Sequence, residues 1–205
     1  QVAALSPTVT GSMDKAGMET RDLDLLTDSS VPEDCSRRII NNPQKDVSEE
    51  ETTTLSDYLK NGGHLLLLAG TTQDTLTNLT SLCSMYGMDL RNGFVADPAP
   101  QHFYSNNPFN VIPDYDFSSG LLTGVDSGQA ALAVQPSGMT IQENLRAGLT
   151  VSPFLTTSYS GLLVDPVTPE QPEGAYILGA PADVTVHDDN DPSSVFPVIR
   201  APALL

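Results

Sequence analysis

The clearest pattern of apolar and polar positions along the chain is a helix between two apolar runs. Leu55, Tyr58 and Leu59 recur at a spacing that places them on one face of a helix. Residues 65–69 form an uninterrupted apolar run, which is typical of a strand covered on both faces. A strand is also expected at residues 37–40. Strand, helix and strand in this order predict a βαβ unit, and hence a parallel sheet with helices packed on it.

The ends of this helix carry their own signals. Ser48 can accept a hydrogen bond from a first-turn amide, and Glu51 can reach back to the amide of Ser48. Gly62 and Gly63 follow the last turn, where glycine readily adopts the left-handed conformation that ends a helix. The helix is therefore expected to lie between Ser48 and Gly62.

The rest of the first half continues the alternation of strands and helices. A first helix is expected within residues 2–16 and a short strand at residues 18–26. Asp74 is expected to cap a further helix that ends at Gly87, and residues 88–95 form the next strand candidate. This pattern predicts an α/β fold with a doubly wound, mainly parallel sheet.

The second half has a different composition. Residues 97–116 are dense in proline, asparagine and aromatic residues, which indicates a long ordered excursion. Its aromatic residues, Phe103, Tyr104 and Phe109, are expected to cover the sheet as a lid; the alternative is an exposed partner surface. Short strand-like runs follow at residues 130–134, 139–141, 149–151, 175–178 and 195–199. We expect extra strands that extend or cap the same sheet, in a single domain spanning residues 1–205.

Charge narrows the possible partners. Nine basic residues stand against 26 acidic ones, for a formal net charge of −17. Nucleic acid and anionic lipid surfaces would both be repelled. No apolar segment approaches the roughly 20 residues that cross a bilayer. Because the chain starts at Gln1, we expect a piece of a longer protein whose membrane anchors lie outside this sequence.

Several motifs occur in an order that resembles a known family, the auxiliary component of ABC-type transport systems linked to gliding motility. The family shows an apolar strand, a proline loop, a D-hydrophobic-S-x-x-E segment, a YL-x-x-GG helix end and a second apolar strand. The matching positions are Ile39, Ile40, Pro43, Asp46, Ser48, Glu51, Tyr58, Leu59, Gly62 and Gly63. The similarity continues through residues 76–97, 107–125 and 155–166. Arg37 and Arg38 stand where the family more often has apolar strand residues.

The resemblance implies a fold akin to flavodoxin-like and class I glutamine-amidotransferase-like sheets. It also implies a bacterial-type domain on the extracytoplasmic face of the cell membrane, with an ABC transporter permease or other membrane components as partners. The leading hypothesis is therefore a non-enzymatic auxiliary domain that acts through protein–protein interaction near the permease. The first alternative is a domain that binds a solute or glycan, and the second is a divergent hydrolase or transferase.

Polar residues follow the two expected parallel strands. The carboxyl edge of such a sheet is where ligands usually bind, and Asn, Gln and Thr side chains can hydrogen-bond a small molecule. The candidate ligand-binding residues are Asn41, Asn42, Gln44, Thr71, Thr72 and Gln73. An ordinary pair of turns is the favoured explanation of these residues.

Other chemistry finds little support in the sequence. Asp188, Asp189 and Asp191 cluster as weak candidates for calcium, but they lack the spacing of a calcium-binding loop. No phosphate-binding motif or nucleophile elbow occurs, so no cofactor and no catalytic residue is expected. Cys35 and Cys83 are far apart in the sequence, and two separate thiols are favoured over a disulfide.

Overall fold

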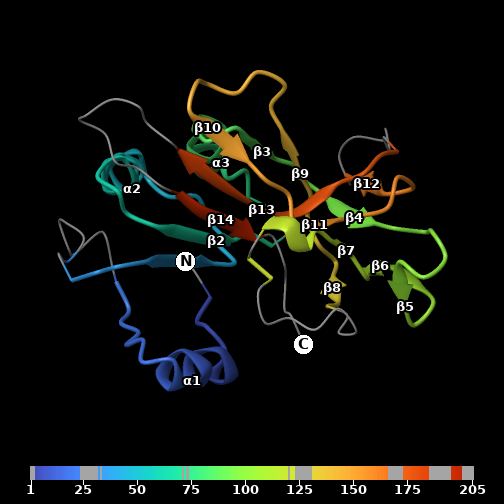
Figure 1. Cartoon of the computed structure of the whole chain (residues 1–205), viewed down its shortest axis with the longest axis horizontal. Helices are drawn as coiled ribbons and strands as arrows, with labels where there is room; N and C mark the ends of the chain where they lie inside the picture. Colours follow the sequence, from blue (N-terminus) through green and yellow to red (C-terminus); the bar gives the residue numbers. More distant parts are fainter. Residues whose placement is uncertain are drawn as a thin grey trace.

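A mixed sheet of nine strands forms the centre of the molecule (Figure 1). A computed structural model describes residues 3–23, 32, 34–70, 72, 74–119, 121–122, 131–165, 173–184 and 195–199. The main path of the sheet runs β1 (Arg38–Asn41), β2 (Leu65–Leu68), β14 (Val195–Ile199), β13 (Ile177–Val184), β11 (Leu155–Thr156) and β7 (Asp114–Tyr115). Beside this path, β9 (Met139–Ile141) and β10 (Leu149–Val151) pair with β13, and β3 (Met88–Leu90) pairs with β9.

The strand directions correct the predicted fold class. Only β1–β2 and β2–β14 pair in parallel, and the other described pairs of this sheet are antiparallel. A parallel pair needs a long crossover, usually through a helix. The three described α-helices all lie before residue 86, so no helical crossover joins the described strands of the second half. The prediction of a doubly wound, mainly parallel, flavodoxin-like or amidotransferase-like sheet is therefore wrong.

The predicted βαβ unit is confirmed. Helix α2 (Glu49–Lys60) joins β1 to β2, and both arms of the capping box form. The Ser48 amide donates to Glu51 Oε2 at 2.7 Å, and the Glu51 amide donates to Ser48 Oγ at 3.1 Å. In β2, alternate leucines are buried against the helices while the others are half-buried, so the strand is fully covered on one face only.

Arg38 explains how a basic residue can start an apolar strand. Its side chain is buried, and its guanidinium lies 5.7 Å from the centre of the Tyr58 ring. Burial lowers the pKa of Arg38 and raises that of Tyr58. The cation–π contact with the Tyr58 ring therefore helps to offset the cost of burying the Arg38 guanidinium.

Helix α3 (Thr77–Met85) receives its cap from a distant loop and not from Asp74. Asp46 Oδ2 accepts a hydrogen bond from the amide of Asn78 at 2.7 Å, and Oδ1 accepts one from Leu79 at 3.1 Å. A carboxylate at this position satisfies first-turn amides and suits the positive end of the helix dipole. The prediction that Asp74 caps α3 was wrong because it considered only neighbours in sequence.

The second half adds two smaller sheets. The strand expected at residues 88–95 is split: Gly93, with φ of 99°, turns the chain out of β3 into β4 (Phe94–Ala96), which pairs with β12 (Leu162–Val164). A three-stranded sheet contains β5 (Phe103–Tyr104), β6 (Asn107–Val111) and β8 (Ala133–Val134), and a short 3-10 turn spans Phe117–Ser119. Two of the aromatic residues expected to form a lid behave differently. The Phe109 ring packs edge to face against Phe94, with 6.3 Å between ring centres, whereas Tyr104 is 60% exposed.

Both cysteines are free, as expected. Cys83, on α3, is buried in the core, and the thiol of half-buried Cys35 donates to the carbonyl of Arg37 at 3.3 Å. None of the described helices has the length and apolar character needed to cross a membrane.

Helix α1 (Pro7–Lys15) lies on the side of the sheet opposite α2 and α3 (Figure 1) and buries none of its residues. The segment before it is attached to the sheet by Asn41, whose amide donates to the carbonyls of Ala3 and Ala4 at 3.2 and 3.1 Å. The expected strand at residues 18–26 does not form in its described part, residues 18–23. A nine-residue helix without a buried face is only marginally stable in water.

Gly11→Ala is expected to stabilise α1 locally without changing the stability of the domain. A Cβ at this position would meet no described heavy atom within 4 Å, and alanine in a helix interior gains about 0.5–1 kcal/mol over glycine. Amide exchange within α1 should therefore slow by roughly two- to fivefold, with the urea midpoint unchanged. A higher urea midpoint would show that α1 unfolds together with the sheet.

Candidate interaction surface

The described residues among those predicted to bind a ligand at the carboxyl edge use their polar groups in hydrogen bonds within the protein. Asn42, with φ of 44°, accepts a hydrogen bond at Oδ1 from Gln44 Nε2 at 2.9 Å. Thr72 Oγ1 donates to the carbonyl of Gln44 at 3.2 Å, and Asn41 holds the amino-terminal segment. Thr71 and Gln73 lie outside the described residues. Ligand binding by this set stays a prediction, and the described members already form hydrogen bonds within the protein.

The weak metal candidates, Asp188, Asp189 and Asp191, also lie outside the described residues. Within the part of the chain that the structure describes, no group of three or more His, Cys, Asp or Glu side chains is placed to hold a metal ion.

A buried carboxylate beyond the end of β4 forms the most developed polar cluster. Asp97 is fully buried and accepts hydrogen bonds from the amide of Ser158 at 2.7 Å and from Ser158 Oγ at 2.8 Å. The amide of Ala99 donates to the same carboxylate at 3.1 Å. A buried carboxylate is costly unless such bonds compensate for lost water. Asp97 thus ties the chain near residue 97 to a turn 61 residues away.

That turn, residues 157–161, is fixed by further bonds. Thr157 is buried, and its Oγ1 accepts the amide of Tyr176 at 2.8 Å. Within the turn, the amide of Ser160 donates to Ser158 Oγ and the amide of Gly161 donates to the Ser158 carbonyl, both at 3.1 Å. A Cβ on Gly161 would lie 2.6 Å from the carbonyl oxygen of Gly174, so only glycine fits there. The turn is therefore held in one conformation.

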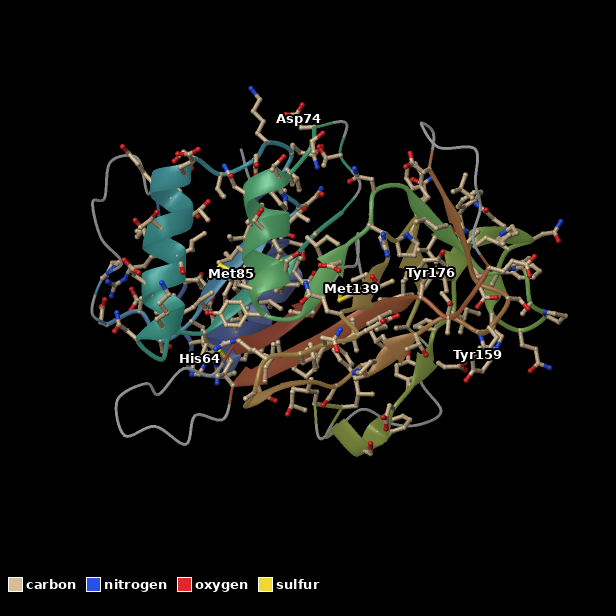
Figure 2. The ribbon with its side chains drawn as sticks, turned by 90° about the horizontal axis from the view of Figure 1, so that it is seen from above. His64, Asp74, Met85, Met139, Tyr159 and Tyr176 are labelled. Atoms are coloured by element: carbon tan, nitrogen blue, oxygen red, sulfur yellow. The ribbon has the colours of Figure 1, made fainter. Side chains whose placement is uncertain are left out.

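Tyr159 projects from this fixed turn. Its side chain is 90% exposed, the largest value among the exposed large hydrophobic residues described. Figure 2 shows it at the end of the molecule opposite His64. The polar bonds beneath the turn thus present one aromatic ring to solvent. We call residues 157–161, with Asp97 beneath them, the Tyr159 turn.

His102 lies beside the same carboxylate. Its Nδ1 is 3.7 Å from Asp97 Oδ2 and 4.0 Å from Asp114 Oδ1, beyond hydrogen-bond distance of both, and this buried atom has no hydrogen-bond partner among the described residues. Serine, histidine and aspartate are therefore neighbours, but the order differs from a catalytic triad. Ser158 Oγ donates to Asp97, whereas nucleophile activation requires the histidine between serine and carboxylate. The cluster positions a turn.

Sequence reasoning did not identify Asp97, Ser158 and Tyr159 as functional residues. Residues 155–166 entered only as part of a family resemblance. The available signal was a single aspartate after a strand and a serine-rich turn ending in Gly161. Nothing local in the sequence pairs two positions that are 61 residues apart.

A surface groove of about 530 Å³ lies between α3 and the segments that follow β3 and β12. Its lining combines hydroxyl groups from α3 with polar and apolar groups from the other segments. The lining residues are Thr75, Leu76, Thr77, Thr80, Ser81, Leu90, Arg91, Asn92, Leu163 and Asp165. Such a volume is within the usual range for small-molecule sites.

Comparison with known proteins supplies a fold neighbour. No family model matches the chain, and no curated protein matches its sequence. The structure is similar to a solved structure described as "mmIFT52 N-terminal domain", with a TM-score of 0.60 and 13% sequence identity. The match covers 95% of this chain and 78% of that chain. At this identity the likeness shows the fold alone.

This neighbour corrects two descriptions drawn from the sequence. The domain is β-rich and not flavodoxin-like, and its structural likeness is to that domain and not to a component of ABC transport. What the comparisons show is that the chain shares the fold of the mmIFT52 N-terminal domain.

Proposed function

We propose that this domain is a non-catalytic protein-binding module whose anchor is Tyr159. One observation carries the proposal: a 90% exposed tyrosine stands on a turn that a fully buried carboxylate holds in place. Tyrosine is enriched among the residues that dominate binding energy at interfaces, because it buries a large area with few rotatable bonds. A turn that is already ordered lowers the entropic cost of association.

The hydrogen bonds of the cluster favour this role over catalysis. Ser158 uses both its amide and its hydroxyl to bond Asp97, and its Oγ also accepts the amide of Ser160. The Ser158 hydroxyl is therefore already used in hydrogen bonds that hold the turn. A nucleophile would instead need a base within hydrogen-bond reach of that proton. The partner class implied by the sequence resemblance, a membrane permease, stays a prediction, as does the extracytoplasmic location.

Tyr159→Ala is expected to weaken binding to the partner about thirtyfold, equivalent to about 2 kcal/mol, because an anchoring side chain is lost. The free energy of unfolding should stay within about 0.5 kcal/mol, since the ring makes few contacts in the free domain. A photo-reactive residue at the neighbouring exposed position 160, which keeps Tyr159, identifies the partner in the full-length protein, and titration then measures affinity.

Met85→Ala is the matched control for this experiment. Met85 is a large apolar residue on α3 that is 48% exposed, and Figure 2 shows it away from Tyr159. Its replacement should leave affinity unchanged. Equal affinity of Tyr159→Ala and the unaltered protein for the crosslinked partner would contradict the proposal.

The groove beside α3 supports a second candidate, the binding of a polar solute or glycan. Thr77 and Thr80 favour sugar binding, because their hydroxyl groups can donate hydrogen bonds to sugar hydroxyls and accept hydrogen bonds from them. Thr80→Val would remove one such group at nearly constant volume. Thermal unfolding against a panel of sugars tests this candidate: a ligand bound by the native state raises the midpoint, and Thr80→Val should reduce that rise.

A further inference from the structure

The Tyr159 turn lies in a half of the chain that is poor in basic residues. From residue 92 onward the only basic residues are Arg146 and Arg200, and no lysine occurs. Arg146 contacts another part of the domain: its guanidinium lies 5.7 Å from the centre of the Tyr86 ring. The second half therefore has little positive charge with which to neutralise its carboxylates.

Two of these carboxylates lie on segments next to the turn. Asp114, with a side chain 62% exposed, approaches His102, which in turn lies beside Asp97. On the other side, Glu173 is exposed and forms an antiparallel bridge with Leu162, and the next residue, Gly174, donates its amide to the carbonyl of Gly161 at 2.9 Å. Asp114 in β7 pairs with Thr156, and Glu173 bridges to Leu162, so the two exposed carboxylates lie on segments paired with the chain three residues before and three residues after Tyr159.

An aromatic face beside carboxylates is a receptor for a cation. The negative face of a tyrosine ring attracts a guanidinium or ammonium group, and a guanidinium also stacks on the ring while its N–H groups reach carboxylate oxygens. Opposite charge across an interface also speeds encounter and excludes acidic competitors.

We propose that the Tyr159 turn binds an arginine-bearing segment of the partner protein, with the guanidinium over the Tyr159 ring and close to Asp114 and Glu173. This inference rests on the proposed function and adds to it the chemistry of the partner. Arg91, the last basic residue before this half of the chain, lines the groove beside α3.

Two peptides test the charge requirement directly on the unaltered 205-residue chain. One contains two arginines separated by glycine, and the other replaces both by citrulline, which keeps the shape and removes the charge. Titrations followed by NMR should show that the arginine peptide shifts the signals of the Tyr159 turn. The citrulline peptide should bind at least tenfold more weakly, and raising the salt from 50 to 500 mM should weaken only the arginine peptide.

Variants distinguish the contribution of the Tyr159 ring to peptide affinity from that of the two carboxylates. Tyr159→Phe keeps the aromatic face and should retain affinity within about threefold, whereas Tyr159→Ala should lose about tenfold. Asp114→Asn combined with Glu173→Gln should weaken binding and reduce the salt dependence. Thr53→Val, on the exposed surface of α2, is the control and should change nothing.

The outcomes distinguish this inference from the proposed function. Equal binding of both peptides, or arginine-peptide binding that survives Tyr159→Ala, would overturn the cation assignment. An absence of any shift with either peptide would overturn it as well. If Tyr159→Ala still weakened binding to the crosslinked partner in those cases, the protein-binding role would stand with an uncharged partner surface.

Discussion

Replacing Asp97 by alanine is expected to lower the free energy of unfolding by about 3–5 kcal/mol, which urea unfolding would measure. The substitution leaves the Ser158 amide, the Ser158 hydroxyl and the Ala99 amide without their acceptor in a buried position. Each buried donor that loses its partner costs about 1–3 kcal/mol. Asp97→Asn keeps one carbonyl oxygen and should lose roughly half as much.

The control for this variant is Asp114→Ala, which removes a neighbouring carboxylate whose side chain is 62% exposed. Exposed pairs contribute about 0–1 kcal/mol, so Asp114→Ala should have little effect. A loss below about 1 kcal/mol for Asp97→Ala would show that water replaces the carboxylate, and that Asp97 does not hold the turn.

Leu67→Ala is expected to cost about 3–4 kcal/mol of unfolding free energy. Leu67 is 1% exposed in β2 and lies against α2 and α3. It already borders a small apolar void of about 10 Å³, shared with Leu59, Leu82 and Met88, and truncation enlarges that void. Loss of buried methyl groups adds to the cost of the cavity.

Two further variants calibrate this effect by urea unfolding. Leu67→Met conserves volume and should cost less than about 1.5 kcal/mol. Leu66→Ala, on the half-buried face of the same strand, should cost clearly less than Leu67→Ala. Equal losses at the two positions would indicate that both faces of β2 are covered alike.

The part of the fold that sequence reasoning predicted correctly is the part governed by local signals. The capping box of Ser48 and Glu51, the apolar spacing within α2 and the long apolar run of β2 each depend on residues a few positions apart. Such signals define a helix and its flanking strands, and a helix between two strands leaves them parallel. The βαβ unit followed from them.

The second half was predicted only in part. The strands expected at residues 139–141, 149–151 and 195–199 form as β9, β10 and β14, but their directions and partners depend on long-range pairing. Strands of two or three residues, such as β11 and β12, are too short for periodicity to show direction. Their antiparallel arrangement follows from β13, which lies at the centre of the sheet and pairs with four other strands. Asp46 and Asp97 act over 32 and 61 residues, and no local pattern predicts either contact.

The central claim is that Tyr159, held by the Asp97 network, anchors a protein partner. Its most direct test is the affinity of the full-length protein for the partner crosslinked at position 160, compared between the unaltered protein, Tyr159→Ala and Met85→Ala. We expect Tyr159→Ala to weaken binding about thirtyfold and Met85→Ala to leave it unchanged. Equal affinities for all three would contradict the claim.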